Sequence, residues 1–303
     1  MSEIDVIERI KQLQAERGAV ILGHNYQVPK IQDIADHLGD SLDLSRLAAR
    51  LPNETIIFCG VHFMAETASI LSPGKKIILP EPDAGCPMAD MINVDDLLSL
   101  KGKHTDAVVV MYVNSTAAVK AETDICCTSA NAVKVIESIP EGRTIIFGPD
   151  RCLGGWVSEM TGRELVIWDG YCPPHQLIIP EEIQALREKY PGSKVMVHPE
   201  TIAAVRTEAD AVLGTGGMIR YAGETDADTF IVGTEAGMCY RLEKEYPEKR
   251  FIPASKRAVC RNMKKITLEK VLASLETLEP VTRVPADTAD RARGAIQRMI
   301  EIG

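Results

Sequence analysis

Three cysteines of this 303-residue chain stand in similar settings at nearly equal intervals. Cys86 and Cys172 each precede a proline, and the interval of 86 residues between them is followed by 88 residues to Cys260. A proline after a ligand cysteine fixes the direction in which the chain leaves the metal, as in many iron–sulfur proteins. A loop cysteine without metal is the simpler interpretation of any one of them, but the shared interval favours three ligands of one centre.

The number and spacing of these cysteines indicate what they could hold. A structural zinc site is closed by four ligands, and the chain has no CxxC pair of the zinc-ribbon kind. Electron-transfer clusters normally use four cysteines. Three thiolates leave one iron of a [4Fe–4S] cluster open, where it could act as a Lewis acid on a carboxylate or hydroxyl. The sequence therefore predicts an open-site cluster on Cys86, Cys172 and Cys260.

The other five cysteines have different settings. Cys59 continues an apolar run and Cys239 opens a helix, so both are expected to pack in the interior. Cys126 and Cys127 are adjacent, and on a strand their side chains would point to opposite faces, where they could not easily hold one ion. Cys152 is expected in a loop, as a spare thiol near the site.

Two further series of residues repeat with almost the same period. They are His24, Tyr112 and His198, and Ser41, Ser129 and Thr215, each with intervals of 88 and 86 residues. Three series with nearly one period predict three stacked copies of a β/α unit. Corresponding strand ends would then converge on a pseudo-threefold axis.

The serine and threonine series is expected at helix starts, where free amides and the helix dipole bind phosphate or carboxylate. Ordinary N-capping is the alternative for each residue taken singly. Beside the three cysteines, anion binding becomes an equally good interpretation for the set.

Acid, base and hydrogen-bonding groups come from another set of strand-end residues. They are His24, Tyr26, Tyr112, Asn114, His198 and Glu200. His175, three residues after Cys172, is either a catalytic group or a residue that supports the cluster from outside its ligand shell. The remaining histidines, His37, His62 and His104, have no such setting and are interpreted as structural or solvated.

These residues follow short apolar runs that predict strands. The runs are 19–22, 55–58, 76–79, 107–110, 144–147, 165–168, 194–197, 211–213, 230–232 and 250–252. The residues of each run are apolar throughout rather than alternately apolar and polar, which is typical of strands buried on both faces of a parallel sheet. The longer amphipathic segments between the runs predict helices. The chain is therefore predicted to be α/β, with ligands beyond the carboxyl ends of the strands.

The period divides the chain into expected domains. We expect three αβα units with parallel sheets at 1–88, 89–174 and 175–261. A helical tail at 262–303 is expected to pack back on the first unit.

Composition and charge exclude several classes of protein. The net charge of −9 argues against non-specific nucleic-acid binding, and no apolar run is long enough to span a membrane. The acidic segment 1–5 lacks the basic region of a secretory signal. We therefore expect a cytoplasmic protein without disulfides.

Taken together, the motifs of this chain resemble those of the quinolinate synthase family. They are Gly23-His24-Asn25-Tyr26-Gln27, Gly39-Asp40-Ser41-Leu42, Gly85-Cys86-Pro87-Met88-Ala89, Tyr112-Val113-Asn114-Ser115, Thr128-Ser129-Ala130-Asn131-Ala132, His198-Pro199-Glu200 and Asn262-Met263-Lys264. The resemblance covers essentially the whole chain and is highly specific in combination. Two departures are Arg261, which follows Cys260 where the family often has proline, and Cys152, where the family usually has no cysteine.

The resemblance implies that iminoaspartate and dihydroxyacetone phosphate condense to quinolinate, phosphate and water, for NAD synthesis. It also implies three αβα units about a pseudo-threefold axis, with a [4Fe–4S] cluster on Cys86, Cys172 and Cys260 at the centre. An acid/base role for Tyr26 is implied, and Glu200 and His175 are further catalytic candidates from their positions. The implied substrate-binding set is His24, Ser41, Tyr112, Asn114, Ser129, His198, Glu200 and Thr215.

Two alternatives stay open at this point. An aconitase-type iron–sulfur hydro-lyase would use the same open iron but release no phosphate. A non-enzymatic iron–sulfur electron-transfer or sensor protein is the second, and the acid/base residues at strand ends count against it. The expected partners are the small-molecule substrates, with functional coupling to an aspartate-oxidising enzyme.

Overall fold

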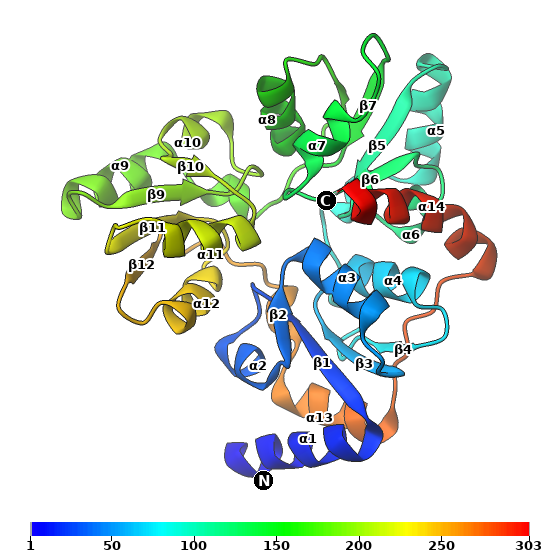
Figure 1. Cartoon of the computed structure of the whole chain (residues 1–303), viewed down its shortest axis with the longest axis vertical. Helices are drawn as coiled ribbons and strands as arrows, with labels where there is room; N and C mark the ends of the chain where they lie inside the picture. The colour runs from blue at the N-terminus through cyan, green and yellow to red at the C-terminus, as the bar shows by residue number, and fades with distance from the viewer. Residues whose placement is uncertain (1, 303) are drawn as a thin grey trace.

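The computed structural model describes residues 2–302, which contain three four-stranded sheets, one in each third of the chain. Figure 1 shows the three lobes arranged around a common centre. All strand pairs within the sheets are parallel. The predicted α/β class with three αβα units is thus confirmed, while the predicted limits of the units stay a prediction.

The first sheet has the strand order β2-β1-β3-β4. Its strands are β1 (Ala19–His24), β2 (His37–Gly39), β3 (Thr55–Cys59) and β4 (Lys76–Ile78). The helices of this part of the chain are α1 (Glu3–Arg17), α2 (Pro29–Ile34), α3 (Ser41–Arg50) and α4 (His62–Leu71). Every residue of β1 and β3 is buried, because helices cover both faces of a parallel sheet.

The second and third sheets repeat this order as β6-β5-β7-β8 and β10-β9-β11-β12. The second unit contains η1 (Ala89–Met91), α5 (Val94–Lys103), β5 (Val108–Tyr112), α6 (Ala117–Lys120), β6 (Ile125–Cys127), α7 (Ala132–Glu137), β7 (Ile145–Gly148), α8 (Arg151–Thr161) and β8 (Val166–Ile167). The third contains η2 (His175–Leu177), α9 (Pro180–Lys189), β9 (Lys194–Val197), α10 (Ala203–Thr207), β10 (Ala211–Val212), α11 (Thr215–Glu224), β11 (Thr229–Gly233), α12 (Met238–Glu245) and β12 (Arg250–Pro253).

All ten predicted apolar runs form strands, and two strands were not predicted. These are β2 and β6, which have only three residues each and pair with β1 and β5 at the sheet edges. Runs this short carry too little periodicity to be distinguished from a loop.

The same side-chain contact occurs in each unit at the start of the edge strand. The aspartate directly before the edge strand accepts a hydrogen bond from an amide of the first strand. The bonds join Asp36 to Ile21 N (2.7 Å), Asp124 to Val109 N (2.8 Å) and Asp210 to Val195 N (2.8 Å). These aspartates are separated by 88 and 86 residues, so the repeat of the sequence is also a repeat of local contacts.

The segment after Cys260 contains η3 (Met263–Lys265), α13 (Leu268–Thr277) and α14 (Ala286–Ile302). α13 packs against α1 and β3, whereas α14 runs along β6 and α6 of the second unit and also contacts α4 (Figure 1). Both helices of the tail thus contact the first unit, and α14 also covers part of the second unit, which was not predicted. Its apolar stripe of Ala292, Ala295, Ile296 and Met299 is buried in this position.

None of the helices within residues 2–302 is long and apolar enough to cross a membrane.

Candidate active site

A cavity lies where the strand ends of the three units meet. It is lined by residues from every series that the sequence singles out. These are Cys86, Cys172, Cys260, His24, Tyr26, Ser41, Tyr112, Asn114, Ser129, His175, His198, Glu200 and Thr215. The structure thus brings together the whole predicted site, while the role of each residue stays a prediction.

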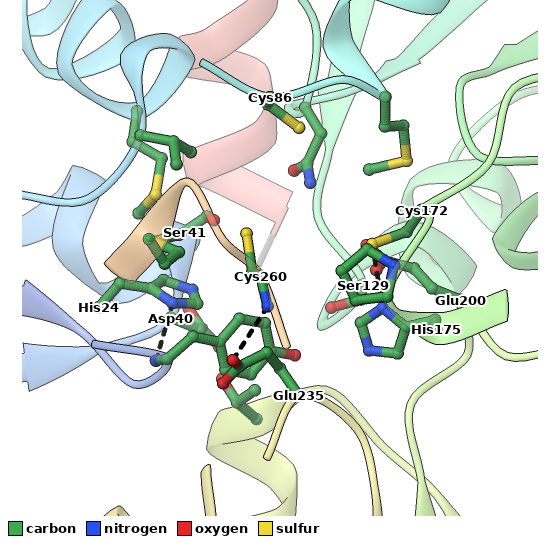
Figure 2. Close-up of a pocket in the computed structure, with 18 of the residues that line it drawn as sticks. His24, Asp40, Ser41, Cys86, Ser129, Cys172, His175, Glu200, Glu235 and Cys260 are labelled. Atoms are coloured by element: carbon green, nitrogen blue, oxygen red, sulfur yellow. Dashed lines mark hydrogen bonds and ion pairs between the residues drawn. The ribbon is translucent and has the colours of Figure 1, made fainter. Parts of the chain in front are cut away.

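The three cysteines reach this cavity through equivalent loops. Each follows the fourth strand of its sheet, and a 3₁₀ turn begins three residues later, at Ala89, His175 and Met263. Figure 2 shows the cysteines approaching one space from three directions. Burial raises the pKa of Cys86 to about 12 and also raises the pKa values of Cys172 and Cys260. The thiols are therefore protonated in the chain without metal.

The separation of the sulfurs tests what centre would fit. Among the described residues, the only group of three or more possible ligands within 4.8 Å of one another is Cys172, His175 and Glu200. At least two of the three cysteine sulfurs are therefore more than 4.8 Å apart. A single tetrahedral zinc ion would hold them about 3.8 Å apart, given Zn–S bonds of about 2.3 Å. The three thiols fit a larger centre, as an iron–sulfur cluster would be.

The group of Cys172, His175 and Glu200 is explained by hydrogen bonding. His175 Nδ1 lies 2.8 Å from Glu200 Oε2 and 3.1 Å from Cys172 Sγ. Glu200 Oε1 accepts a hydrogen bond of 2.6 Å from Tyr112 OH. Both carboxylate oxygens therefore have buried donors.

This group continues into a chain of hydrogen bonds that ends at Tyr26. The hydroxyl of Thr234 lies 2.8 Å from His175 Nε2 and 2.6 Å from Tyr26 OH. An ionised Glu200 can only accept, so His175 carries its proton on Nδ1 and offers the lone pair of Nε2 to Thr234. Thr234 then donates to His175 and accepts from Tyr26. The direction of the bonds is the same along the whole path from Tyr26 to Glu200.

The electrostatics support this assignment of protons. Burial opposes the ionisation of Glu200, but His198, His175 and the bonds from His175 and Tyr112 more than offset it, so that its pKa is lowered. Burial, reinforced by the charge of Glu200, raises the pKa values of Tyr26 and Tyr112 well above the ordinary value. Glu200 is thus anionic beside two neutral phenols.

Two histidines of the site are held as neutral donors. His24 Nδ1 accepts from the amide of Tyr26 (3.1 Å), and His198 Nδ1 accepts from the amide of Glu200 (3.3 Å). Both rings must then carry their proton on Nε2. Burial lowers the pKa of His24 to about 3 and that of His198 to about 4. His198 Nε2 lies 3.1 Å from the Oγ of Ser129, which belongs to the serine and threonine series.

The predicted anion site is best formed at the start of α11. Within residues 2–302 no side chain caps this helix, and Thr215, its first residue, accepts from Asn25 Nδ2 at 2.9 Å. Gly216 and Gly217 follow, so the first-turn amides are not covered by side chains of their own. A Cβ on Gly214 would lie 2.9 Å from Ser129 Oγ, which explains the glycine there. Free amides at a helix start favour a phosphate or carboxylate ligand.

The other two members of that series also lie near helix starts, as predicted, but their surroundings differ. Ser41 begins α3, where Asp40 Oδ1 already accepts from the amides of Leu42 and Asp43, each at 2.9 Å. Ser129 lies in the turn after β6, three residues before α7 begins. Of the three helix starts, that of α11 is the one that combines the lack of a side-chain cap among the described residues with two glycines in its first turn.

Comparison with known proteins gives the family. The family model described as quinolinate synthetase A protein matches residues 8–301. The chain belongs to the quinolinate synthetase A family. A protein named quinolinate synthase from Dehalococcoides mccartyi is 54% identical over 297 residues, which is 98% of both chains. Another of that name from Methanosarcina barkeri is 48% identical over 302 residues, covering 100% of this chain and 99% of the relative.

The resemblance predicted from the motifs is confirmed over the whole fold. A third relative, from Geobacter metallireducens, is also named quinolinate synthase and is 50% identical over 295 residues, 97% of both chains. Membership of the quinolinate synthetase A family makes this chain an enzyme.

Three residues at this candidate site were not predicted from the sequence. Thr234 links Tyr26 to His175, Glu235 lines the cavity beside Cys260, and Asp40 lines it beside Ser41. A signal for two of them was present, because Gly233-Thr234-Glu235 directly follows a predicted strand, as the other polar clusters do.

The remaining cysteines and histidines lie outside the set of residues that line the cavity. Cys59 and Cys239 are buried, as predicted, and Cys126 and Cys127 are buried as well. Cys152 was expected in a loop, but it is the second residue of α8, where Gln176 Nε2 donates to its sulfur at 3.6 Å. Asp150 caps this helix, which begins at Arg151, so Cys152 lies in its first turn.

Proposed function

We propose that this enzyme condenses iminoaspartate with dihydroxyacetone phosphate to form quinolinate, phosphate and water, in the biosynthesis of NAD. One observation carries the proposal: three cysteines from three units face one cavity that also holds an acid–base chain and an uncapped helix start. The names of the relatives support the product.

We assign Cys86, Cys172 and Cys260 as the ligands of a [4Fe–4S] cluster. Their sulfurs are too far apart for one ion, and each comes from a loop that begins a 3₁₀ turn. When bound, the cluster would supply a Lewis acid, at its iron without a protein ligand, that polarises a substrate carboxylate or hydroxyl and assists the loss of water.

The phosphate and carboxylate groups of the substrates are held by helix amides and by side chains other than the three cysteines. The free amides at the start of α11 and the hydroxyl of Thr215 bind phosphate. His24 and His198 donate from Nε2 to oxygen atoms of the substrates, because both rings are neutral and fixed by their Nδ1 bonds. Ser41, Ser129, Tyr112 and Asn114 complete the binding set.

Proton transfer is the task of Tyr26 and Glu200. The proton of Tyr26 can pass to Thr234 while the Thr234 proton passes to His175 Nε2 and the Nδ1 proton passes to Glu200. A substrate proton replaces it on Tyr26 in the same step, so that Tyr26 stays a neutral phenol, as its raised pKa requires, and Glu200 takes up the net proton as the base. In the reverse direction Tyr26 gives a proton to the substrate as an acid. General acid–base catalysis of this kind contributes about 10²–10⁴-fold in rate. His175 is thus part of the catalytic chain.

We also place the enzyme in the cytoplasm, where thiols remain reduced. An imine hydrolyses readily in water, so iminoaspartate has to be made close to where it is consumed. This supports functional coupling to an aspartate-oxidising enzyme.

Iron and sulfide analysis of anaerobically purified protein tests the cluster, and about four of each are expected per chain. Cys86→Ala, Cys172→Ala and Cys260→Ala should each abolish the visible iron–sulfur absorption, whereas Cys239→Ser should retain it. A full cluster in Cys260→Ala would overturn the ligand assignment.

The reaction is tested by measuring phosphate release and quinolinate formation from the two substrates under anaerobic conditions. Both products should appear in equal amounts. Turnover of a citrate-like acid without phosphate release would instead identify a hydro-lyase, and a loaded protein inactive in both assays would favour electron transfer.

A further inference from the structure

One position next to each cysteine loop is equivalent in the three units. In every unit, the carbonyl two residues before the cysteine accepts a bond from an amide that follows the third strand. The bonds are His62 N to Ala84 O (2.8 Å), Arg151 N to Gly170 O (2.7 Å) and Ala236 N to Ala258 O (2.8 Å). The residues just before these amides are Val61, Asp150 and Glu235, all with exposures of 2% or less.

In the second unit this position carries a carboxylate that holds the cysteine backbone. Asp150 Oδ2 accepts from the amide of Cys172 at 2.9 Å. Asp150 Oδ1 accepts from the amide of Leu153, in the first turn of α8, at 2.8 Å. The side chain therefore ties the cysteine loop to the start of the neighbouring helix, and both oxygens are used by backbone donors.

Glu235 does the same in the third unit. Its Oε1 accepts from the amide of Cys260 at 3.1 Å, which Figure 2 marks with a dashed line, and its Oε2 accepts from the amide of Gly237 at 2.7 Å. Lys264 Nζ lies 2.9 Å from Oε1 and neutralises the buried charge. A Cβ on Gly237 would lie 2.6 Å from Lys264 Nζ and 2.7 Å from Glu235 Oε2, so only glycine leaves room for this pair.

The first unit lacks the carboxylate. The side chain of Val61 has no atom that could accept a hydrogen bond from the amide of Cys86. The Cys86 loop is held from another unit instead, because Asn262 Nδ2 donates to Gly85 O at 2.8 Å. Asn262 stands two residues after Cys260, so the support of the Cys86 loop depends on the Cys260 loop being in place.

We propose that Asp150 and Glu235 are positioning residues for cluster assembly, which clamp the backbones of Cys172 and Cys260 toward the cavity before iron arrives. The Cys86 loop, which has no such clamp, closes on the cluster last. The inference rests on the proposed function, since it takes the three cysteines as ligands. An amide side chain could not replace either clamp, because its NH₂ group would face a backbone N–H.

Asp150→Ser separates the clamp from ordinary helix capping. A serine at this position can still accept from Leu153 and cap α8, but its hydroxyl is too short to bridge to the Cys172 amide as well. Asp169→Ser is the matched control, because Asp169 lies three residues before Cys172 in the same loop and its side chain is 84% exposed. The corresponding change at Glu235 is less clean, since it would leave Lys264 without its partner.

Amide hydrogen exchange of the full chain without cluster, followed by mass spectrometry, gives a readout independent of activity. Pro173 and Pro174 have no amide hydrogen, so a short peptide across this loop reports mainly on Cys172. We expect protection at Cys172 and Cys260 and faster exchange at Cys86. Asp150→Ser should raise the exchange rate at Cys172 by about 10- to 100-fold, the range for loss of one hydrogen bond to a charged group. Cys260 should not change.

Anaerobic loading with ferrous iron and sulfide completes the test. Asp150→Ser should gain visible cluster absorption more slowly than the wild type and lose it faster to a chelator, with a melting temperature near that of Asp169→Ser. Wild-type exchange at Cys172 together with wild-type loading in Asp150→Ser would overturn the clamp. A wild-type protein that binds no iron would instead overturn the proposed function, and the exchange data would still decide on the clamp.

Discussion

Thr234→Val removes the one hydroxyl that connects Tyr26 to the rest of the acid–base chain. Valine has nearly the shape of threonine, with a methyl group in place of the hydroxyl. The change deletes an acceptor 2.6 Å from Tyr26 OH and a donor 2.8 Å from His175 Nε2. Thr234 is fully buried, so there is no exposed surface at which bulk water could take over the hydroxyl's contacts.

The size of the effect depends on whether the chain moves protons. A proton path that is interrupted should lower kcat by about 10²–10⁴-fold, the usual contribution of general acid–base catalysis. Loss of the buried hydrogen bonds should cost about 1–3 kcal/mol of folding stability at the same time. If Thr234 only supports the fold, the loss of activity should not exceed the loss of folded, loaded protein.

The assay is quinolinate formation under anaerobic conditions, measured beside iron content and melting temperature. Thr201→Val is a matched control, since Thr201 is also fully buried in the third unit but donates only to the carbonyl of His198 at 2.7 Å. Thr234→Ser keeps the hydroxyl and should recover most of the turnover. A kcat of Thr234→Val near that of the wild type would refute the relay, as would equal losses in Thr201→Val.

Three further results are expected. Glu200→Gln should lower turnover by roughly 10²–10⁴-fold, well beyond its effect on iron content and on the fraction of folded protein, although the amide faces a buried donor and should lower the melting temperature; equal losses of cluster and activity would make Glu200 structural. Thr215→Ala should weaken a phosphate-containing substrate analogue by about 1.5–3 kcal/mol in calorimetry without loss of cluster, and unchanged affinity would return Thr215 to a purely structural role. Stability should fall in acid: the folded-state pKa values of His24 and His198, about 3 and 4, lie below the ordinary 6.5, so the unfolded chain takes up protons first. Each histidine should cost about 2 kcal/mol between pH 7 and pH 5, and denaturant titrations of His24→Gln should show a smaller pH dependence.

The fold was predictable because its strands are buried on both faces and therefore read as continuous apolar runs. What the sequence did not show depends on contacts between distant segments. β2 and β6 are strands only because they pair with β1 and β5. The contact of α14 with the second unit was also not predictable, since its apolar stripe indicates that this face is buried but not which units cover it.

The candidate site was predictable to the extent that it follows the repeat. Residues that form a three-member series, such as the cysteines, were found by their spacing alone. Thr234 and Glu235 were missed because the corresponding segment of the first unit, Gly60-Val61, has no polar side chain and so forms no series. The equivalence of Val61, Asp150 and Glu235 is not visible in their residue types. It is visible in the structure, because the amide after each of them donates to the carbonyl two residues before a cysteine.

The three units have the same backbone arrangement but carry different side chains at equivalent positions. We infer that the proposed reaction depends on these differences. Two residues after His24, Tyr112 and His198, the three units carry a phenol, an amide and a carboxylate at equivalent places, namely Tyr26, Asn114 and Glu200. Three identical groups would give a cavity that could not distinguish two different substrates or assign acid and base to different sides. The same reasoning applies to the position next to each cysteine loop, which holds Val61, Asp150 or Glu235. A third buried carboxylate at Val61 would add an uncompensated charge beside the cluster, whereas valine leaves the Cys86 loop free to close after the other two are set. We therefore infer that the repeat supplies the position of each group and that divergence between the units supplies the chemistry.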